Sequence, residues 1–124
     1  MSYLVVFLGA GLGGALRHGV NRFALDHYGP AYPYGTLIVN VAGGFMIGAL
    51  AELFLARTGG SQEWRLFLTT GILGGFTTFS AFSLDAALMI QRGNWWALIS
   101  YVSGSVILAI VALFLGMALV RAAS

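Results

Sequence analysis

Long runs without charge dominate the chain and predict its elements. They extend over residues 1–16, 35–51, 66–84 and 93–120. A bilayer core requires about 20 predominantly apolar residues per helix, so we expect four membrane-spanning helices, over residues 3–24, 35–55, 66–90 and 94–121. Because the connections between these spans are short, the pattern predicts an all-α integral membrane protein in which residues 1–124 form a single four-helix domain.

Composition narrows the possible classes of function. The sequence is 59% hydrophobic and 8% charged, and its mean hydropathy of +0.89 lies outside the usual range of soluble domains. With no cysteine, the chain offers no disulfide, thiolate metal site or thiol nucleophile. Its net charge of +2 is too small and too scattered for a nucleic-acid surface. The sequence also offers no paired nucleophile and base, so we expect no enzyme.

The arginines favour neither orientation of the chain in the membrane. Four spans place both termini and the middle connection on one side, together with Arg57, Arg65 and Arg121, whereas Arg22 and Arg92 lie on the other side. Orientation follows the excess of Lys and Arg near the span ends, and three arginines against two is a weak excess. Two interpretations stay open: a weak signal in a small protein, or a chain that inserts in both orientations.

The first span carries two patterns that have other common meanings. Residues 1–19 could form a signal peptide, but they lack a basic N-terminal region and supply one of the four spans, so we expect them to be retained. The sequence "GAGLGG", residues 9–14, matches a dinucleotide-binding motif, which requires a preceding strand that an apolar helix does not offer. Close helix packing explains these glycines better. The same spacing occurs in the pairs Gly9/Gly13, Gly44/Gly48 and Gly71/Gly75.

The third span, with "TTGILGGFTTFSAFSLD" over residues 69–85, combines glycines and hydroxyls at membrane depth. Gly74 and Gly75, followed by Thr77, give weak helix propensity, so we predict a break from Gly74 to Thr77. A broken helix is tolerated in the membrane where it is buried in protein or lines a cavity. The break would free backbone carbonyl groups, which are cation ligands in discontinuous transporter helices.

Three phenylalanines follow at helical spacing. Phe76, Phe79 and Phe82 are predicted to share one helix face, beside a strip that carries Ser80 and Ser83. Such a stripe is usually packing, but the edge of a phenyl ring is electropositive and can face an anion.

Each remaining polar residue of the spans has a structural and a functional interpretation. Asn40 either bonds across helices or offers its amide donors to an anion. Arg17, beside His18, either reaches the interface or makes an electropositive vestibule. Asp85 either pairs with an arginine or lies at the mouth of a pathway. We also expect an interfacial aromatic belt before the second span, made of Tyr28, Tyr32 and Tyr34. On the fourth span we expect a helix contact face made of Tyr101, Ser103, Gly104 and Ser105.

Over its whole length the chain resembles the small fluoride channels called Fluc or CrcB-like proteins. The resemblance is most specific in the glycine-rich first span that ends in "LRH", in "GTLIVNVAGG", and in "TTGILGGFTTFSAFS". It implies an antiparallel, dual-topology homodimer in the lipid of the bacterial plasma (inner) membrane. Such a dimer has two fluoride pores and a structural sodium ion at its centre, and it exports fluoride from the cytoplasm down its electrochemical gradient.

The resemblance also implies roles for individual residues. Fluoride would contact ring edges, an amide and hydroxyl groups along the pore, supplied by Phe79, Phe82, Asn40, Ser80, Ser83, Tyr101 and Ser105. The backbone carbonyls of Gly74 and Thr77 would bind the sodium ion. Arg17 and Asp85 match vestibule positions. The chain departs from common family patterns at Ala81, Asp85 and Ala109, where relatives often carry threonine, glutamate and serine.

Two other classes of membrane protein fit the sequence less well. A small multidrug-type exporter also has four short spans, but its proton coupling needs a carboxylate in the first span, and this chain has none there. A non-transporting assembly subunit gives no reason for polar groups in the middle of the third span.

Overall fold

The structure, a computed structural model, describes residues 1–56 and 62–123, and every regular element in those ranges is helical. The connection at residues 57–61, which includes Arg57, lies outside the described residues. Along the chain the elements are α1 (Ser2–Tyr28), α2 (Tyr34–Ala56), α3 (Gln62–Arg65), the π-helix η1 (Leu66–Leu73), α4 (Gly74–Phe76), α5 (Ser80–Gln91) and α6 (Trp95–Ala123).

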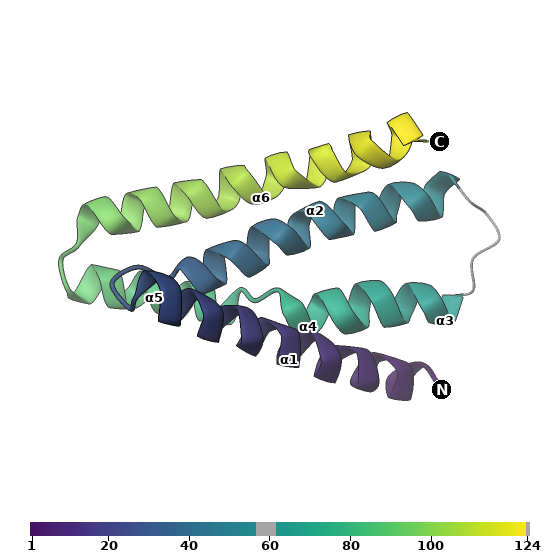
Figure 1. Cartoon of the computed structure of the whole chain (residues 1–124), viewed down its shortest axis with the longest axis horizontal. Coiled ribbons are helices and arrows are strands. Elements are labelled where there is room, and N and C mark those ends of the chain that lie inside the picture. Colours follow the sequence, from purple (N-terminus) through teal and green to yellow (C-terminus); the bar gives the residue numbers. More distant parts are fainter. Residues whose placement is uncertain (57–61, 124) are drawn as a thin grey trace.

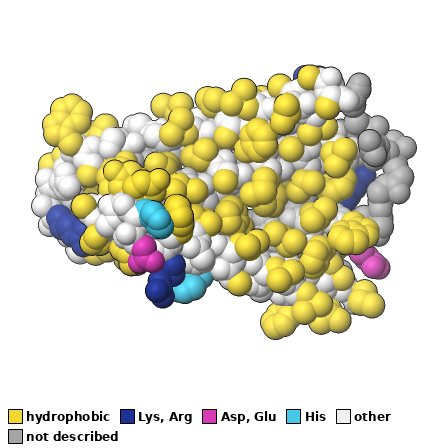
Figure 2. All heavy atoms as spheres, viewed as in Figure 1, with side chains coloured by type: hydrophobic (Ala, Val, Ile, Leu, Met, Phe, Trp, Pro, Cys, Tyr) yellow, Lys and Arg dark blue, Asp and Glu magenta, His cyan; other side chains and the backbone are white. Residues whose placement is uncertain are grey.

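Four helical segments of the described chain are long and apolar enough to cross a membrane. They are α1, α2, the series from α3 to α5, and α6, which confirms the predicted all-helical membrane fold. The segments lie side by side, and both termini lie at the same end of the molecule (Figure 1). Hydrophobic side chains cover most of the face shown in Figure 2, and the charged side chains lie toward its two ends.

Close glycine contacts hold the helices in two pairs. On α1, a Cβ atom at Gly9 would lie 2.9 Å from Gly71 Cα, and one at Gly13 would lie 2.8 Å from the Phe76 nitrogen. On α2, a Cβ at Gly44 would lie 2.7 Å from the Ala109 carbonyl oxygen of α6. These distances leave no room for a side chain, so the glycines allow the backbone contacts that stabilise helix pairs in lipid.

The third span is interrupted, but later in the sequence than predicted. Gly74 keeps helical angles (φ −63°, ψ −38°), and the chain becomes extended only at Thr77 (φ −84°, ψ 157°) before α5 begins at Ser80. Helix α4, which contains both glycines, packs on α1 through Gly75, where a Cβ would lie 2.9 Å from Ala10 Cα. Tertiary packing therefore overrides their weak helix propensity.

The interruption also separates the three phenylalanines. Phe76 ends α4 and is buried, whereas Phe79 lies beyond the extended segment and is 78% exposed. The prediction that Phe76, Phe79 and Phe82 share one helix face was therefore wrong, because no continuous helix connects Phe76 to the other two rings.

Candidate functional site

At the interruption, side chains replace the regular hydrogen bonds of the helix. In a continuous α-helix the Thr78 N–H would donate to the Gly74 carbonyl, and the Ala81 N–H to the Thr77 carbonyl. Instead, Thr78 N–H donates to Asn40 Oδ1 at 2.9 Å, and Ala81 N–H donates to Thr78 Oγ1 at 3.1 Å. The carbonyl groups of Gly74 and Thr77 thus lose their usual donors to two side chains.

Two further side-chain donors reach this segment from other spans. Asn40 Nδ2 on α2 donates to the Thr78 carbonyl at 3.0 Å, so the side-chain amide of Asn40 bonds both the backbone N–H and the backbone carbonyl of Thr78. Arg17 Nε on α1 donates to the Gly75 carbonyl at 3.1 Å. Because a broken helix in a membrane needs partners for its backbone, Asn40 and Arg17 stabilise the interruption, and Asn40 bonds across helices as one of its two interpretations predicted.

Two cavities lie on either side of Asn40. The first, which we call the glycine cavity, has a volume of about 250 Å³ and is lined by Asn40, Gly43, Gly44, Ile47, Thr69, Leu73, Gly74 and Thr77. The second, which we call the aromatic groove, has a volume of about 280 Å³ and is lined by Asn40, Thr77, Thr78, Phe79, Phe82, Ser105, Val106 and Ala109. Among the described residues, neither lining includes a charged side chain.

The aromatic groove brings together four residues predicted for the pore, namely Asn40, Phe79, Phe82 and Ser105. The Phe79 and Phe82 ring centroids are 5.7 Å apart, at an interplanar angle of 38°. Phe82 in turn lies 5.1 Å from the Tyr101 ring, which is fully buried. The rings thus form a continuous aromatic series from the interruption toward one end of the molecule.

Ser105 is the most unusual polar residue of the groove. It is only 5% exposed, and among the described residues its hydroxyl oxygen has no hydrogen-bond partner. An unpaired buried hydroxyl costs about 1–3 kcal/mol, so such a group calls for an explanation. A ligand that accepts a hydrogen bond in the groove supplies one.

The two other predicted hydroxyls are engaged near the start of α5. Ser83 Oγ donates to the Phe79 carbonyl at 2.9 Å, and Ser80 Oγ lies 3.3 Å from Thr78 Oγ1. Sequence reasoning did not assign a role to Thr78, although this residue meets Asn40 through its backbone and Ala81 through its side chain. The sequence could have indicated this contact, because Thr78 lies three residues before Ala81. That is the spacing at which the hydroxyl of an N-cap threonine accepts a hydrogen bond from a backbone N–H of the first helical turn.

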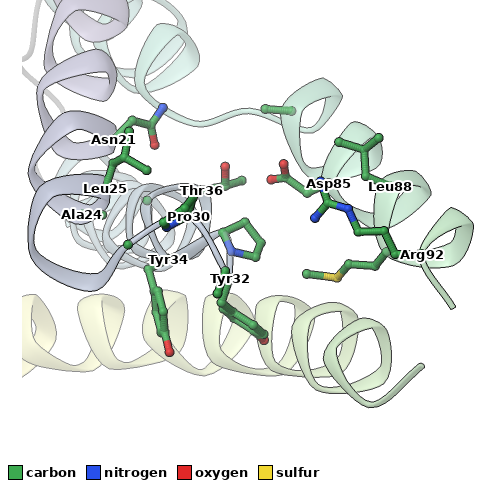
Figure 3. A pocket seen from close by; sticks show the side chains of 16 residues that line it. Asn21, Ala24, Leu25, Pro30, Tyr32, Tyr34, Thr36, Asp85, Leu88 and Arg92 are labelled. Carbon is green, nitrogen blue, oxygen red and sulfur yellow. The ribbon is translucent and has the colours of Figure 1, made fainter. Parts of the chain in front are cut away.

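A larger pocket of about 420 Å³ opens at the end of the molecule opposite the termini, and we call it the terminal pocket. Asp85 of α5 and Arg92, which directly follows α5, point into it, near Thr36 and Tyr32 (Figure 3). Asp85 also accepts a hydrogen bond from the Tyr101 hydroxyl at 2.9 Å. Asp85 therefore connects the terminal pocket with the aromatic series, whereas Arg17, the other residue predicted for a vestibule, lies against the interruption.

Known proteins match this chain along almost its whole length. Residues 4–117 match the family model described as CrcB-like protein, Camphor Resistance (CrcB). Two curated relatives, from Granulibacter bethesdensis and Rhodopseudomonas palustris, are each 54% identical, with 98% of this chain and 95% and 98% of their own lengths covered. A third, from Rhizobium meliloti, is 50% identical over 96% of this chain and 95% of its own length. All three are named fluoride-specific ion channel FluC. From the matched length and these identities, the chain belongs to the CrcB-like family.

Proposed function

We propose that this chain forms a fluoride-specific ion channel in the bacterial inner membrane, where it exports fluoride from the cytoplasm. The relatives carry this function in their names, and the aromatic groove offers donors suited to a small anion. The observation that carries the proposal is the buried, unpaired hydroxyl of Ser105 beside the rings of Phe79 and Phe82.

The chemistry of the groove suits fluoride conduction. A conduit for a strongly hydrated ion must replace water without holding the ion too tightly. The Ser105 hydroxyl can donate a hydrogen bond, and the edges of the Phe79 and Phe82 rings carry partial positive charge. Because the described residues that line the groove are all uncharged, these groups would stabilise fluoride without trapping it. Asp85 and Tyr101 connect this segment with the terminal pocket, from which the anion would enter.

The channel would be an antiparallel homodimer of dual topology. Phe79 lies at mid-span and is 78% exposed in the single chain, so a second copy would complete the groove around it. The arginines near the span ends are nearly balanced in the sequence, with three on the side of the termini (Arg57, Arg65 and Arg121) against Arg22 and Arg92 on the other side. This balance favours insertion in both orientations.

A structural sodium ion at the dimer centre completes the proposal. The glycine cavity fits such an ion because its lining contains Gly74 and Thr77, whose carbonyls have lost their regular helix donors. Carbonyl oxygens are hard ligands, and the lining contains no carboxylate that would favour a divalent cation. When bound, the ion would supply positive charge that offsets unpaired backbone oxygens in lipid.

Fluoride efflux from liposomes that contain only the purified protein tests the proposed function. With a potassium ionophore to balance charge, fluoride should leave the protein-containing liposomes rapidly and chloride slowly, while protein-free liposomes retain both ions. Efflux that requires a proton gradient, or transport of an organic cation, would favour a multidrug-type exporter. The absence of any flux from folded protein would favour a non-transporting subunit.

A further inference from the structure

Asn40 occupies the wall between the two cavities. It is the residue of α2 that bonds to the interruption, and it lines both the glycine cavity and the aromatic groove. Thr77 is the other residue common to both linings. Any change in how Asn40 binds the third span therefore reaches both cavities at once.

The hydrogen bonds of Asn40 and Thr78 decide which carbonyls of the interruption stay available. The Thr78 N–H, which a regular helix would direct to Gly74, is taken by Asn40 Oδ1 at 2.9 Å. The Ala81 N–H, which a regular helix would direct to Thr77, is taken by Thr78 Oγ1 at 3.1 Å. Both side chains therefore compete with the two carbonyls for their own helix donors.

We propose that Asn40 and Thr78 are positioning residues of the cation site. By capturing these N–H groups they keep the Gly74 and Thr77 carbonyls free for the ion, and they do so from the side of the aromatic groove. The cation site and the anion path thus share one set of hydrogen bonds. This inference rests on the proposed sodium site and assigns to Asn40 a role beyond direct contact with fluoride.

Without these side chains, the helix can close over the carbonyls. In Asn40→Ala the Thr78 N–H has no side-chain acceptor and regains the Gly74 carbonyl as its nearest regular partner. In Thr78→Val, which keeps the shape of the side chain, the Ala81 N–H can return to the Thr77 carbonyl in the same way. Each variant removes one carbonyl oxygen of each subunit from the cation, so both should bind sodium more weakly.

Thermal unfolding of the purified full-length protein at increasing sodium concentration measures this effect directly. A cation that binds only the folded state raises the melting temperature with its concentration. An organic cation, N-methylglucamine, replaces sodium at constant ionic strength. We define the sodium midpoint as the concentration at which sodium stabilises the folded state by RT ln 2, since that concentration equals the dissociation constant. We expect Asn40→Ala and Thr78→Val to raise this midpoint by about tenfold or more, the value of one or two hydrogen bonds.

Two controls separate positioning from general damage. Thr78→Ser keeps the hydroxyl and should keep the wild-type sodium midpoint. Ser105→Ala alters the aromatic groove without touching the interruption, and it should also keep that midpoint although its fluoride flux falls. The isosteric Thr78→Val provides the test if Asn40→Ala does not fold.

The outcomes are distinguishable. Midpoints of Asn40→Ala and Thr78→Val equal to that of the wild type would overturn the inference and leave the cation site intact. A wild-type melting temperature that does not change with sodium concentration would overturn the proposed cation site together with the inference. Fluoride conduction would still be decided by the liposome experiment.

Discussion

At the scale of single residues, Ser105 shows how a stability cost indicates a site. Its hydroxyl is buried on α6 without a partner among the described residues, whereas Ser103, two positions earlier on the same helix, is exposed. A buried unpaired hydroxyl costs more than a methyl group at the same place. The residue therefore lowers the stability of the empty groove and, on the proposed function, provides a donor for fluoride.

Ser105→Ala should lower fluoride flux while leaving the melting temperature unchanged or slightly higher. The loss of one donor to a charged ligand is worth about 1.5–3 kcal/mol, which corresponds to roughly tenfold or more in binding. Ser103→Ala, the matched control on the exposed side of α6, should conduct as the wild type does. A Ser105→Ala protein with full flux would show that the hydroxyl is not part of the path.

The two rings of the groove lead to a second prediction at this scale. Phe79→Ile or Phe82→Ile should abolish or sharply reduce fluoride flux, because isoleucine keeps much of the bulk but lacks the electropositive ring edge. Phe114→Ile, at an exposed position of α6 outside the groove lining, serves as the control. Liposome efflux is the measurement, and wild-type flux in both groove variants would contradict the proposed role of the rings.

At the scale of elements, the contact of α1 with η1 and α4 decides where the third span breaks. The π-helix is a rare conformation that often occurs near functional sites, and here it ends directly before the glycines of α4. A Cβ atom at Gly9 or Gly13 of α1 would lie 3.0 Å or less from backbone atoms of this region. Because this contact holds the helix that contains Gly74 and Gly75 against α1, with Gly75 at the contact, the chain leaves the helix only at Thr77.

Gly13→Ala and Gly11→Ala should differ in sign, although both lie on α1. A helical glycine replaced by alanine gains up to about 1 kcal/mol from helix propensity. At Gly11 nothing lies within 4 Å of the added Cβ, so that variant should be neutral or more stable. At Gly13 the Cβ would meet the Ile72 carbonyl oxygen, and overpacking typically costs about 1–3 kcal/mol.

Thermal unfolding of the two variants in the same detergent measures this difference. Gly13→Ala should melt at a lower temperature than the wild type and Gly11→Ala should not. Equal melting temperatures would mean that α1 and the third span can separate without cost at this contact.

At the scale of the whole molecule, the single chain has a large apolar surface. Side chains such as Phe7 at 73% and Phe114 at 63% exposure need lipid or a second copy around them. A bidentate ion pair, with Arg121 Nε 2.9 Å from Glu52 Oε1, joins α6 to α2 at the end that carries the termini. Most of the described charges thus lie near the two ends of the bundle (Figure 2), whereas Arg17 lies against the interruption.

Dual topology predicts a specific response to added charge. Two lysines inserted in the connection between α5 and α6, beside Arg92, should force one orientation, because Lys and Arg excess near span ends sets topology. That variant should lose fluoride flux when expressed alone and regain it when coexpressed with a chain biased in the opposite direction. Accessibility labelling of tags at the termini checks the unmodified protein, and labelling on one side only would contradict dual topology.

The sequence by itself determined the features that depend on local composition and spacing. Charge-free runs of sufficient length predict the four apolar helices, because backbone groups in lipid must be paired within helices. The pairs Gly9/Gly13 and Gly71/Gly75 predict close helix packing, because small residues let helix backbones approach each other in lipid. Four groove residues, Asn40 and Ser105 among them, were also predicted from the sequence and its resemblance to the family.

Only the tertiary structure decided how these parts meet. Local propensity places the break at the glycines, yet the packing of α4 on α1 through Gly75 keeps them helical. The break moves to Thr77, and Asn40 supplies replacement hydrogen bonds at the next residue, Thr78. The same shift removes Phe76 from the row of Phe79 and Phe82. The roles of Thr78 and Arg17 depend on partners 38 and 58 positions away in the sequence. Such partners are set by packing between helices, which no local pattern encodes.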